Sequence, residues 1–170
     1  LKKHVLLMVE NVVENLVLTY IDPDVREENK NPEGLITALS EKFGAGFREV
    51  VDKNLDDMDG LLEALEEKAQ EQLERREQEF GPERMQYLVR FILLQVIDTK
   101  WKEHLYGLDN LREGIGLRAY GQRDPLVEYK REAFHMFEEL MQGISLAVSA
   151  SVFRSTTSID SFAAFLKGLG

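Results

Sequence analysis

The feature that most constrains the fold is a stripe of large apolar side chains that recurs every three or four residues near the middle of the chain. Its members are Tyr87, Phe91, Leu94, Ile97, Trp101, Leu105, Leu108 and Leu111. This spacing is typical of one face of an amphipathic helix, and it predicts a helix of about seven turns. We expect that helix to end at Gly114, because glycine commonly terminates helices.

A second stripe follows after a short loop. Asp124 and Pro125 supply a capping residue and a first-turn proline, so a second helix is expected to start there. Its apolar face consists of Leu126, Tyr129, Ala133, Phe137, Leu140 and Ile144. Two long helices with one apolar stripe each and a short connection should pack antiparallel as a hairpin.

The residues before the hairpin predict a smaller group of helices. Residues 2–20 show helical spacing, and Asn31-Pro32 has the capping residue and proline that begin a helix. Gly81-Pro82 is the clearest break in the sequence. No alternating strand pattern is present, so the fold class is expected to be all-α.

We expect three parts in this all-α fold. A small helical subdomain covers residues 1–82, and the long antiparallel two-helix hairpin covers residues 83–144. The third part is an atypical, serine-rich tail over residues 145–170. Its first residues are able to extend the helix, and the serine and threonine run at residues 155–158 should break it.

The sequence offers no catalytic or metal-binding constellation. It contains no cysteine, and His4, His104 and His135 are too far apart to form a metal-ligand motif. Gly114 and Gly116 follow a predicted helix rather than a strand, which argues against a nucleotide-binding loop. We therefore expect no active site, no cofactor and no metal in this chain.

Charge and hydropathy limit the classes of partner. The formal net charge of -10 disfavours broad binding to nucleic acid, because an acidic chain repels phosphate. The apolar residues near the N-terminus are interrupted by Glu10 and Glu14, which favours an amphipathic helix over a signal peptide or a membrane span. Because the chain begins with Leu1 inside this predicted helix, we expect it to be a piece of a longer protein.

The predicted tip of the hairpin is the exception to this plain pattern. Ile115, Leu117 and Tyr120 are large apolar side chains in a glycine-rich loop, where polar residues are usual. They either fold back onto the hairpin or form a contact surface, in which tyrosine supplies rigid area and a hydroxyl group. Residues 98–131 carry seven basic and six acidic side chains, including Arg118 at the tip. This near-neutral charge suits an anionic or a mixed polar and apolar partner.

Two runs of residues resemble a known family. They are LQVIDTKWKEHL at residues 94–105 and DNLREGIGLRAYGQRDPLVEYKRE at residues 109–132. Both closely resemble the two-helix finger of the helical scaffold domain of SecA, the bacterial preprotein translocase motor. Residues 1–82 resemble the helical wing domain of that family more loosely, so the resemblance extends to residue 144. The tail from residue 145 differs from the family's last scaffold helix, and the family's cysteine-rich zinc motif is absent.

The resemblance implies a part of a cytoplasmic ATPase that associates peripherally with the inner face of the plasma membrane. In the family, ATP and Mg²⁺ are bound by nucleotide-binding domains that this chain lacks, so the chain is not expected to be catalytic alone. The expected partners are unfolded secretory preproteins, the Sec channel and the rest of the motor ATPase. An anionic lipid surface is a further candidate partner.

The same resemblance assigns roles to two groups of residues. The substrate-contacting group at the finger tip is Ile115, Leu117, Arg118 and Tyr120. The group that packs against the motor and restrains ATP turnover is Trp101, His104 and Arg112. Tyr120 is the position that corresponds to the family's contact with the translocating chain.

Two other interpretations are open. The hairpin would also suit a free-standing helical adaptor or oligomerisation module, although the steps between Ile97, Trp101 and Leu105 break a strict heptad. A nucleic-acid-binding hairpin that uses Arg118 and Arg123 is the third interpretation, and the acidic background disfavours it.

Overall fold

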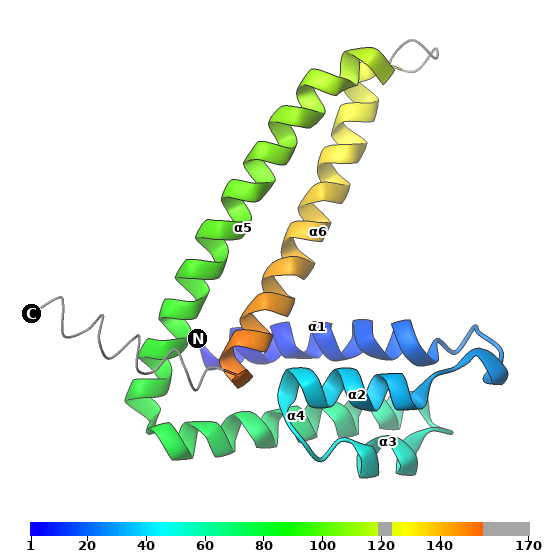
Figure 1. The fold of residues 1–170 in the computed structure, drawn as a ribbon, viewed down its shortest axis with the longest axis vertical. Coiled ribbons are helices and arrows are strands. Elements are labelled where there is room, and N and C mark those ends of the chain that lie inside the picture. Colours follow the sequence, from blue (N-terminus) through cyan, green and yellow to red (C-terminus); the bar gives the residue numbers. More distant parts are fainter. Residues whose placement is uncertain (119–123, 155–170) are drawn as a thin grey trace, which may run out of the picture. The chain divides into compact units, whose positions relative to one another are not determined.

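The chain folds into helices. The computed structural model describes residues 1–118 and 124–154, and no β-strand occurs in these two ranges. The helices are α1 (Lys2–Ile21), α2 (Pro32–Phe43), α3 (Arg48–Asn54), α4 (Met58–Phe80), α5 (Pro82–Arg118) and α6 (Pro125–Arg154), with a 3-10 turn η1 (Glu27–Asn29) after α1 (Figure 1). The predicted all-α fold is confirmed.

The helices form two compact units, each of which is described by itself. The N-terminal unit contains Leu1–Ile92 and the chain from Ser145 onward, and the hairpin unit contains Leu93–Ile144. Both α5 and α6 therefore contribute residues to both units.

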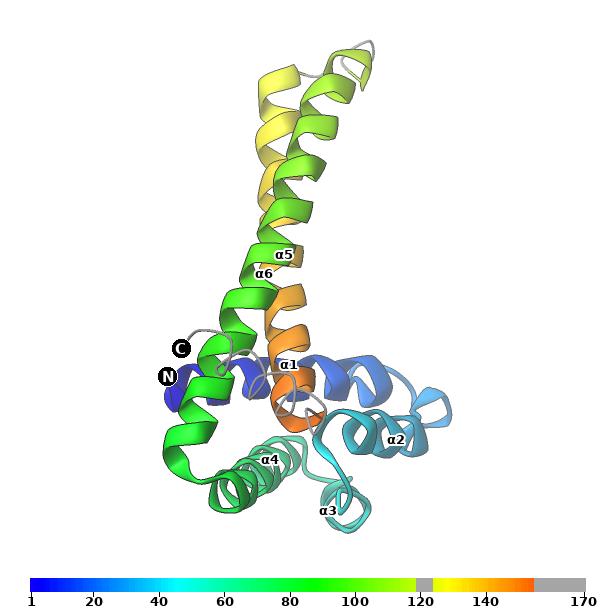
Figure 2. The same ribbon diagram turned by 60° about the vertical axis from the view of Figure 1, so that its left-hand side comes forward.

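The core of the N-terminal unit forms where α1 packs against α2 and α4 (Figure 2). The fully buried side chains of these three helices are aliphatic. They include Val5, Val9, Val13 and Val17 of α1, Leu35 and Leu39 of α2, and Leu61, Leu65 and Ala69 of α4. By length and composition α1 would also pass as a membrane-spanning helix. Its valine face packs into this core, as expected for an amphipathic helix of a folded domain.

Capping residues and a glycine set the ends of these helices. Asn31 Oδ1 accepts a hydrogen bond from the Gly34 N–H at 2.9 Å, and Asp57 Oδ1 accepts one from the Gly60 N–H at 3.1 Å. Gly81 has a φ of 81°, a left-handed conformation that favours glycine. The helix α4 therefore ends at Phe80 and α5 starts at once, so the predicted helix break is confirmed.

The N-terminal unit extends beyond the boundary expected at residue 82. The first turns of α5 bury Met85, Leu88 and Val89 within this unit. The last described turns of α6 bury Val148 and Val152 in the same unit. A glycine-proline break ends a helix, but it does not end a hydrophobic core, since core membership depends on contacts distant in sequence. Residues 145–154 therefore continue α6 as part of the N-terminal unit. The rest of the predicted tail lies outside the described residues.

The helix α5 does not end at Gly114. It continues to Arg118, so Ile115 and the backbone of Leu117 belong to its last turns rather than to a loop. Positive φ values occur at other glycines of the described chain, but not at Gly114 or Gly116. A Cβ atom added at either position would meet no atom within 4 Å. Glycine permits a helix end without requiring one, which is why the predicted end was wrong.

Candidate functional site

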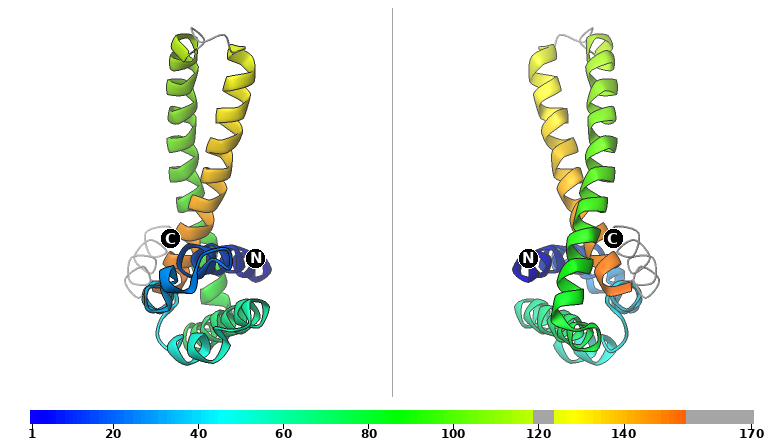
Figure 3. Two further views of the ribbon diagram at one scale, coloured as in Figure 1. Left: turned by 90° about the vertical axis from the view of Figure 1, so that its right-hand side faces the viewer. Right: turned by 90° about the vertical axis from the view of Figure 1, so that its left-hand side faces the viewer.

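The two helices of the hairpin unit run antiparallel and side by side (Figure 3). A Cβ atom added at Gly107 of α5 would lie 2.6 Å from Met136 Cε of α6. A Cβ atom added at Gly143 of α6 would lie 3.8 Å from Lys100 Cδ of α5. These two close contacts set the register of the pair. Gly107 of α5 lies opposite Met136 of α6, and Lys100 of α5 lies opposite Gly143 of α6. The predicted antiparallel hairpin is present.

An aromatic cluster lies in the hairpin unit. The ring centroids of Trp101 and His104, which are one turn apart on α5, are separated by 5.5 Å. The ring of His104 meets that of Phe137 of α6 edge-on, with centroids 6.2 Å apart. His104 is 9% exposed, whereas Trp101 is 46% exposed. His104 therefore fills the space between the helices, and Trp101 covers it while leaving part of its own ring open.

Large exposed apolar side chains gather on one face of the hairpin unit. On α5, Leu105 follows the covered His104 by one position, and on α6, Met141 follows the covered Leu140. One position is a rotation of about 100° in the same sense on each helix. Because the helices are antiparallel, this rotation brings both side chains to the same side of the pair. The residues of this apolar face are Leu94, Ile97, Trp101 and Leu105 of α5 and Phe134, Phe137 and Met141 of α6.

This arrangement corrects the buried stripe predicted for α5. Tyr87, Leu94 and Trp101 are exposed, although the spacing placed them on the core side. The apolar residues of α5 are spread over more than one face, so their spacing alone does not identify the face that packs. On α6 the prediction holds in part, since Leu140 and Ile144 are buried whereas Leu126 and Phe137 are exposed.

Comparison with known proteins identifies this combination of a small helical unit and a long hairpin. The sequence model of the SecA wing and scaffold domain matches residues 1–156. The chain belongs to the SecA family.

Its relatives include SecA subunits of protein translocases. The protein translocase subunit SecA of Thermodesulfovibrio yellowstonii is 46% identical over 119 residues, which is 70% of this chain and 14% of that protein. The protein translocase subunit SecA of Pelotomaculum thermopropionicum is 40% identical over 159 residues, which is 91% of this chain and 18% of that protein. The chain thus spans a small part of the length of these relatives, the SecA wing and scaffold region. The match to residue 156 also includes residues 145–154, which the resemblance alone had left outside the family region.

The structure places some of the predicted SecA site residues and leaves others outside the description. Trp101 and His104 are brought together with Phe137, a residue whose spacing predicted only a buried position. Arg112 is exposed on α5, and Ile115 is half-buried. The side chains of Leu117 and Arg118, and the whole of Tyr120, lie outside the described residues.

The described hairpin unit presents an apolar face and ion pairs on its surface. In the part of the chain that the structure describes, no three acidic or histidine side chains are grouped closely enough to hold a metal ion. The Lys100 ammonium pairs with Glu103 at 2.9 Å, one turn apart on the helix surface.

Sequence reasoning missed Phe134 and Met141, which complete the apolar face. Their one-position offset from Ala133 and Leu140 is the signal that could have identified them.

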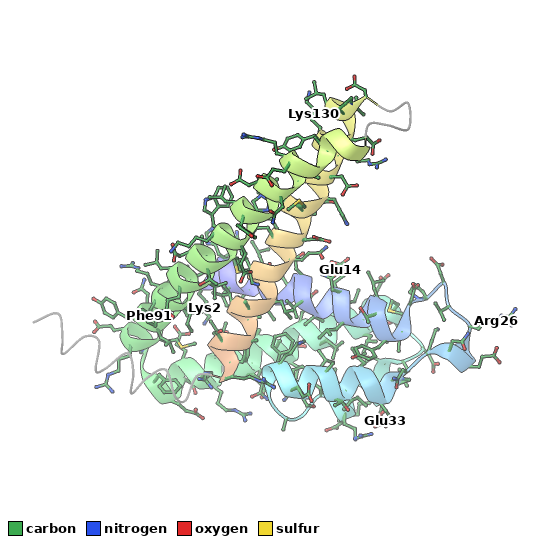
Figure 4. The ribbon with its side chains drawn as sticks, turned by 45° about the horizontal axis from the view of Figure 1, so that its top comes forward. Lys2, Glu14, Arg26, Glu33, Phe91 and Lys130 are labelled. Atoms are coloured by element: carbon green, nitrogen blue, oxygen red, sulfur yellow. The ribbon has the colours of Figure 1, made fainter. Side chains whose placement is uncertain are left out.

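An acidic groove lies between α1 and α4 of the N-terminal unit. This hollow of about 560 Å³ has Leu6 and Val9 among its apolar lining. Its carboxylates come from Glu10, Glu63, Glu66, Glu67, Glu71 and Glu74. Burial raises the pKa of Glu66, and neighbouring negative charges, among them that of Glu14 on α1 (Figure 4), raise it further. The groove therefore opposes ionisation of Glu66, whereas the Lys68 ammonium lowers the pKa of Glu71 at the same groove.

Proposed function

We propose that this chain is the segment of a SecA translocase in which the hairpin acts as a two-helix finger on the translocating preprotein at the Sec channel. The continuity of the two helices carries this proposal. The helix α5 is unbroken to Arg118, and α6 starts again at Pro125. Continuous helices resist bending, because each turn is hydrogen-bonded to the next. Such a pair suits the transmission of force along its length.

The residue between the two helices that we assign to substrate contact is Tyr120. It follows the end of α5 by two positions in the sequence. A tyrosine ring offers rigid apolar area, and its hydroxyl group is able to bond to any peptide backbone. This chemistry suits unfolded preproteins, whose sequences differ. In this proposal Ile115, Leu117 and Arg118 lie beside the contact, and ATP and Mg²⁺ are bound elsewhere in the complete subunit.

A disulfide cross-link tests the substrate contact. The chain contains no cysteine, so a single one placed at Tyr120→Cys is unique within it. The complete subunit, freed of any other cysteine, is used to stall a secretory protein that carries one cysteine in the Sec channel. We expect a disulfide from residue 120 to the stalled protein.

The matched control is Glu67→Cys, an exposed position on the charged helix α4. This variant should give no disulfide with the same stalled protein. Absence of the cross-link at residue 120, in a channel shown to be occupied, would reject the finger contact.

We further propose that Trp101 and Arg112 dock on the rest of the motor and restrain ATP turnover, and that the covered His104 supports the Trp101 ring in this contact. The apolar face supports this role, since large contiguous apolar surface is usually covered by a partner. A free-standing oligomerisation module would instead bury this face between copies of the chain. A monomeric complete subunit with restrained ATPase activity would therefore favour the docking role.

The proposed place of work is the cytoplasmic face of the plasma membrane, where the Sec channel opens to the motor. Lys130, on α6 near the connection between the helices, supplies positive charge for an anionic lipid surface (Figure 4). Binding to vesicles with and without anionic lipid tests this contact, and equal binding to both would reject it.

A further inference from the structure

The carboxyl end of α6 receives a hydrogen bond from a distant part of the chain. The last carbonyl groups of any helix have no partner within that helix. In α6, which ends at Arg154, the carbonyl oxygen of Phe153 accepts a hydrogen bond from Arg76 Nη1 at 2.6 Å. Arg76 lies on α4, and both residues belong to the N-terminal unit. A cation at this end of a helix also faces the negative end of the helix dipole.

Arg76 lies in surroundings that are unfavourable for a charged group. It is half-buried, its guanidinium carbon is 5.1 Å from the centroid of the Phe80 ring, and burial lowers its pKa. Its Nε and Nη2 atoms are buried and have no hydrogen-bond partner among the described residues. Taking such a group out of water is costly unless it makes compensating interactions. The Phe153 carbonyl is the hydrogen-bond acceptor that the structure provides for it.

Two further contacts fix the same turn of α6. The ring of Phe153 packs edge-on against Phe43 of α2, with centroids 5.0 Å apart. Arg154 Nε donates a hydrogen bond to the carbonyl oxygen of Glu41, also on α2. The last turn of α6 is thus held by two helices. The helix α4 contributes the Arg76 hydrogen bond, and α2 contributes the Phe43 ring and the Glu41 carbonyl.

We propose that Arg76 is a positioning residue for the finger, because it fixes the carboxyl end of α6 in the N-terminal unit. This inference rests on the proposed function of the hairpin. A helix that pushes on a substrate needs a fixed end, and residues 145–154 are the end of α6 that a folded core holds. Arg76 then acts through α6 and has no contact with the substrate.

Hydrogen exchange tests the anchor itself. In the complete subunit, Arg76→Met keeps the apolar stem and removes the donors. We expect backbone amides of residues 145–154 to exchange about tenfold faster in this variant, since a charged donor to that turn is lost. Arg76→Lys keeps the charge but loses the planar guanidinium group. The exchange rate of these amides in Arg76→Lys should lie between the rates in the wild type and in Arg76→Met. Unchanged exchange in Arg76→Met would overturn the proposal.

Transport efficiency tests the positioning role. The control is Arg75→Met, which removes an exposed neighbour on the same helix that pairs with Glu71 at 3.5 Å. We expect preprotein transported per ATP hydrolysed to fall in Arg76→Met, to recover in part in Arg76→Lys, and to stay at the wild-type value in Arg75→Met. A merely structural role would lower thermal stability and leave this ratio unchanged, and that result would also overturn the proposal. The Tyr120→Cys cross-link in a cysteine-free subunit that keeps Arg76 reports separately on the finger contact, so the two failures are distinguishable.

Discussion

The ring of Phe153, one residue before the end of α6, meets the ring of Phe43, at the end of α2, nearly edge-on with centroids 5.0 Å apart. Both rings are buried in the core of the N-terminal unit. Aromatic pairs in this geometry stabilise a fold beyond the burial of their area. The contact shows that the end of α6 belongs to the folded core rather than to a loose tail.

Truncation of the Phe153 ring should therefore strongly destabilise the fold. Phe153→Ala should lower the free energy of unfolding by about 3–5 kcal/mol, because it leaves a cavity beside Phe43. Phe134→Ala is the control, since Phe134 is 64% exposed and its loss should change stability by about 0.5 kcal/mol at most. Urea denaturation measures both values. Equal effects of the two substitutions would show that Phe153 is not part of the core.

Substitution of Gly114 should stabilise the hairpin. Because α5 continues through this residue with open space around it, Gly114→Ala should raise the free energy of unfolding by about 0.5–1 kcal/mol. Gly81→Ala should do the opposite, since Gly81 has a left-handed backbone conformation that alanine disfavours. Thermal unfolding followed by circular dichroism compares the two. A loss of stability in Gly114→Ala would mean that the helix ends there after all.

Trp101 should matter more for regulation than for folding. With 46% of the side chain exposed, Trp101→Ala should cost about 1–2 kcal/mol, less than a fully buried tryptophan would. In the complete subunit, the same substitution should raise basal ATP turnover, because the proposed docking contact is lost. Tyr106→Ala, at a more exposed position of α5 outside the apolar face, should leave turnover unchanged. Unchanged turnover in Trp101→Ala would reject the docking role of this face.

The acidic groove should make stability depend on pH in a defined direction. The pKa of Glu66 is raised in the folded state above its ordinary value of 4.5, so ionisation of this side chain opposes folding. Its unfavourable contribution is absent well below pH 4.5 and develops as pH rises through the folded pKa. Glu66→Gln should therefore stabilise the chain at pH 7, by about 0.5 kcal/mol or less. Denaturation curves at pH 7 and pH 3.5 measure the difference, and a gain that persists at the lower pH would contradict this cause.

Local signals in the sequence identified most helix ends. Asn31 and Gly81 cap or break helices through contacts with residues a few positions away, so their effect is visible in a short stretch of sequence. Gly114 was misinterpreted for the same reason. A glycine lowers helix propensity locally, but the surrounding turns of α5 were sufficient to continue the helix.

The sequence by itself determined the all-α class, the hairpin and the SecA family, because periodicity, caps and matching residues are properties of contiguous segments. Only the tertiary structure decided which face of α5 packs, since apolar residues lie on several of its faces. It also decided that residues 145–154 join the core, and that Arg76 reaches the Phe153 carbonyl. These relationships join residues far apart in the chain, and their energies arise only when the helices that carry them come together.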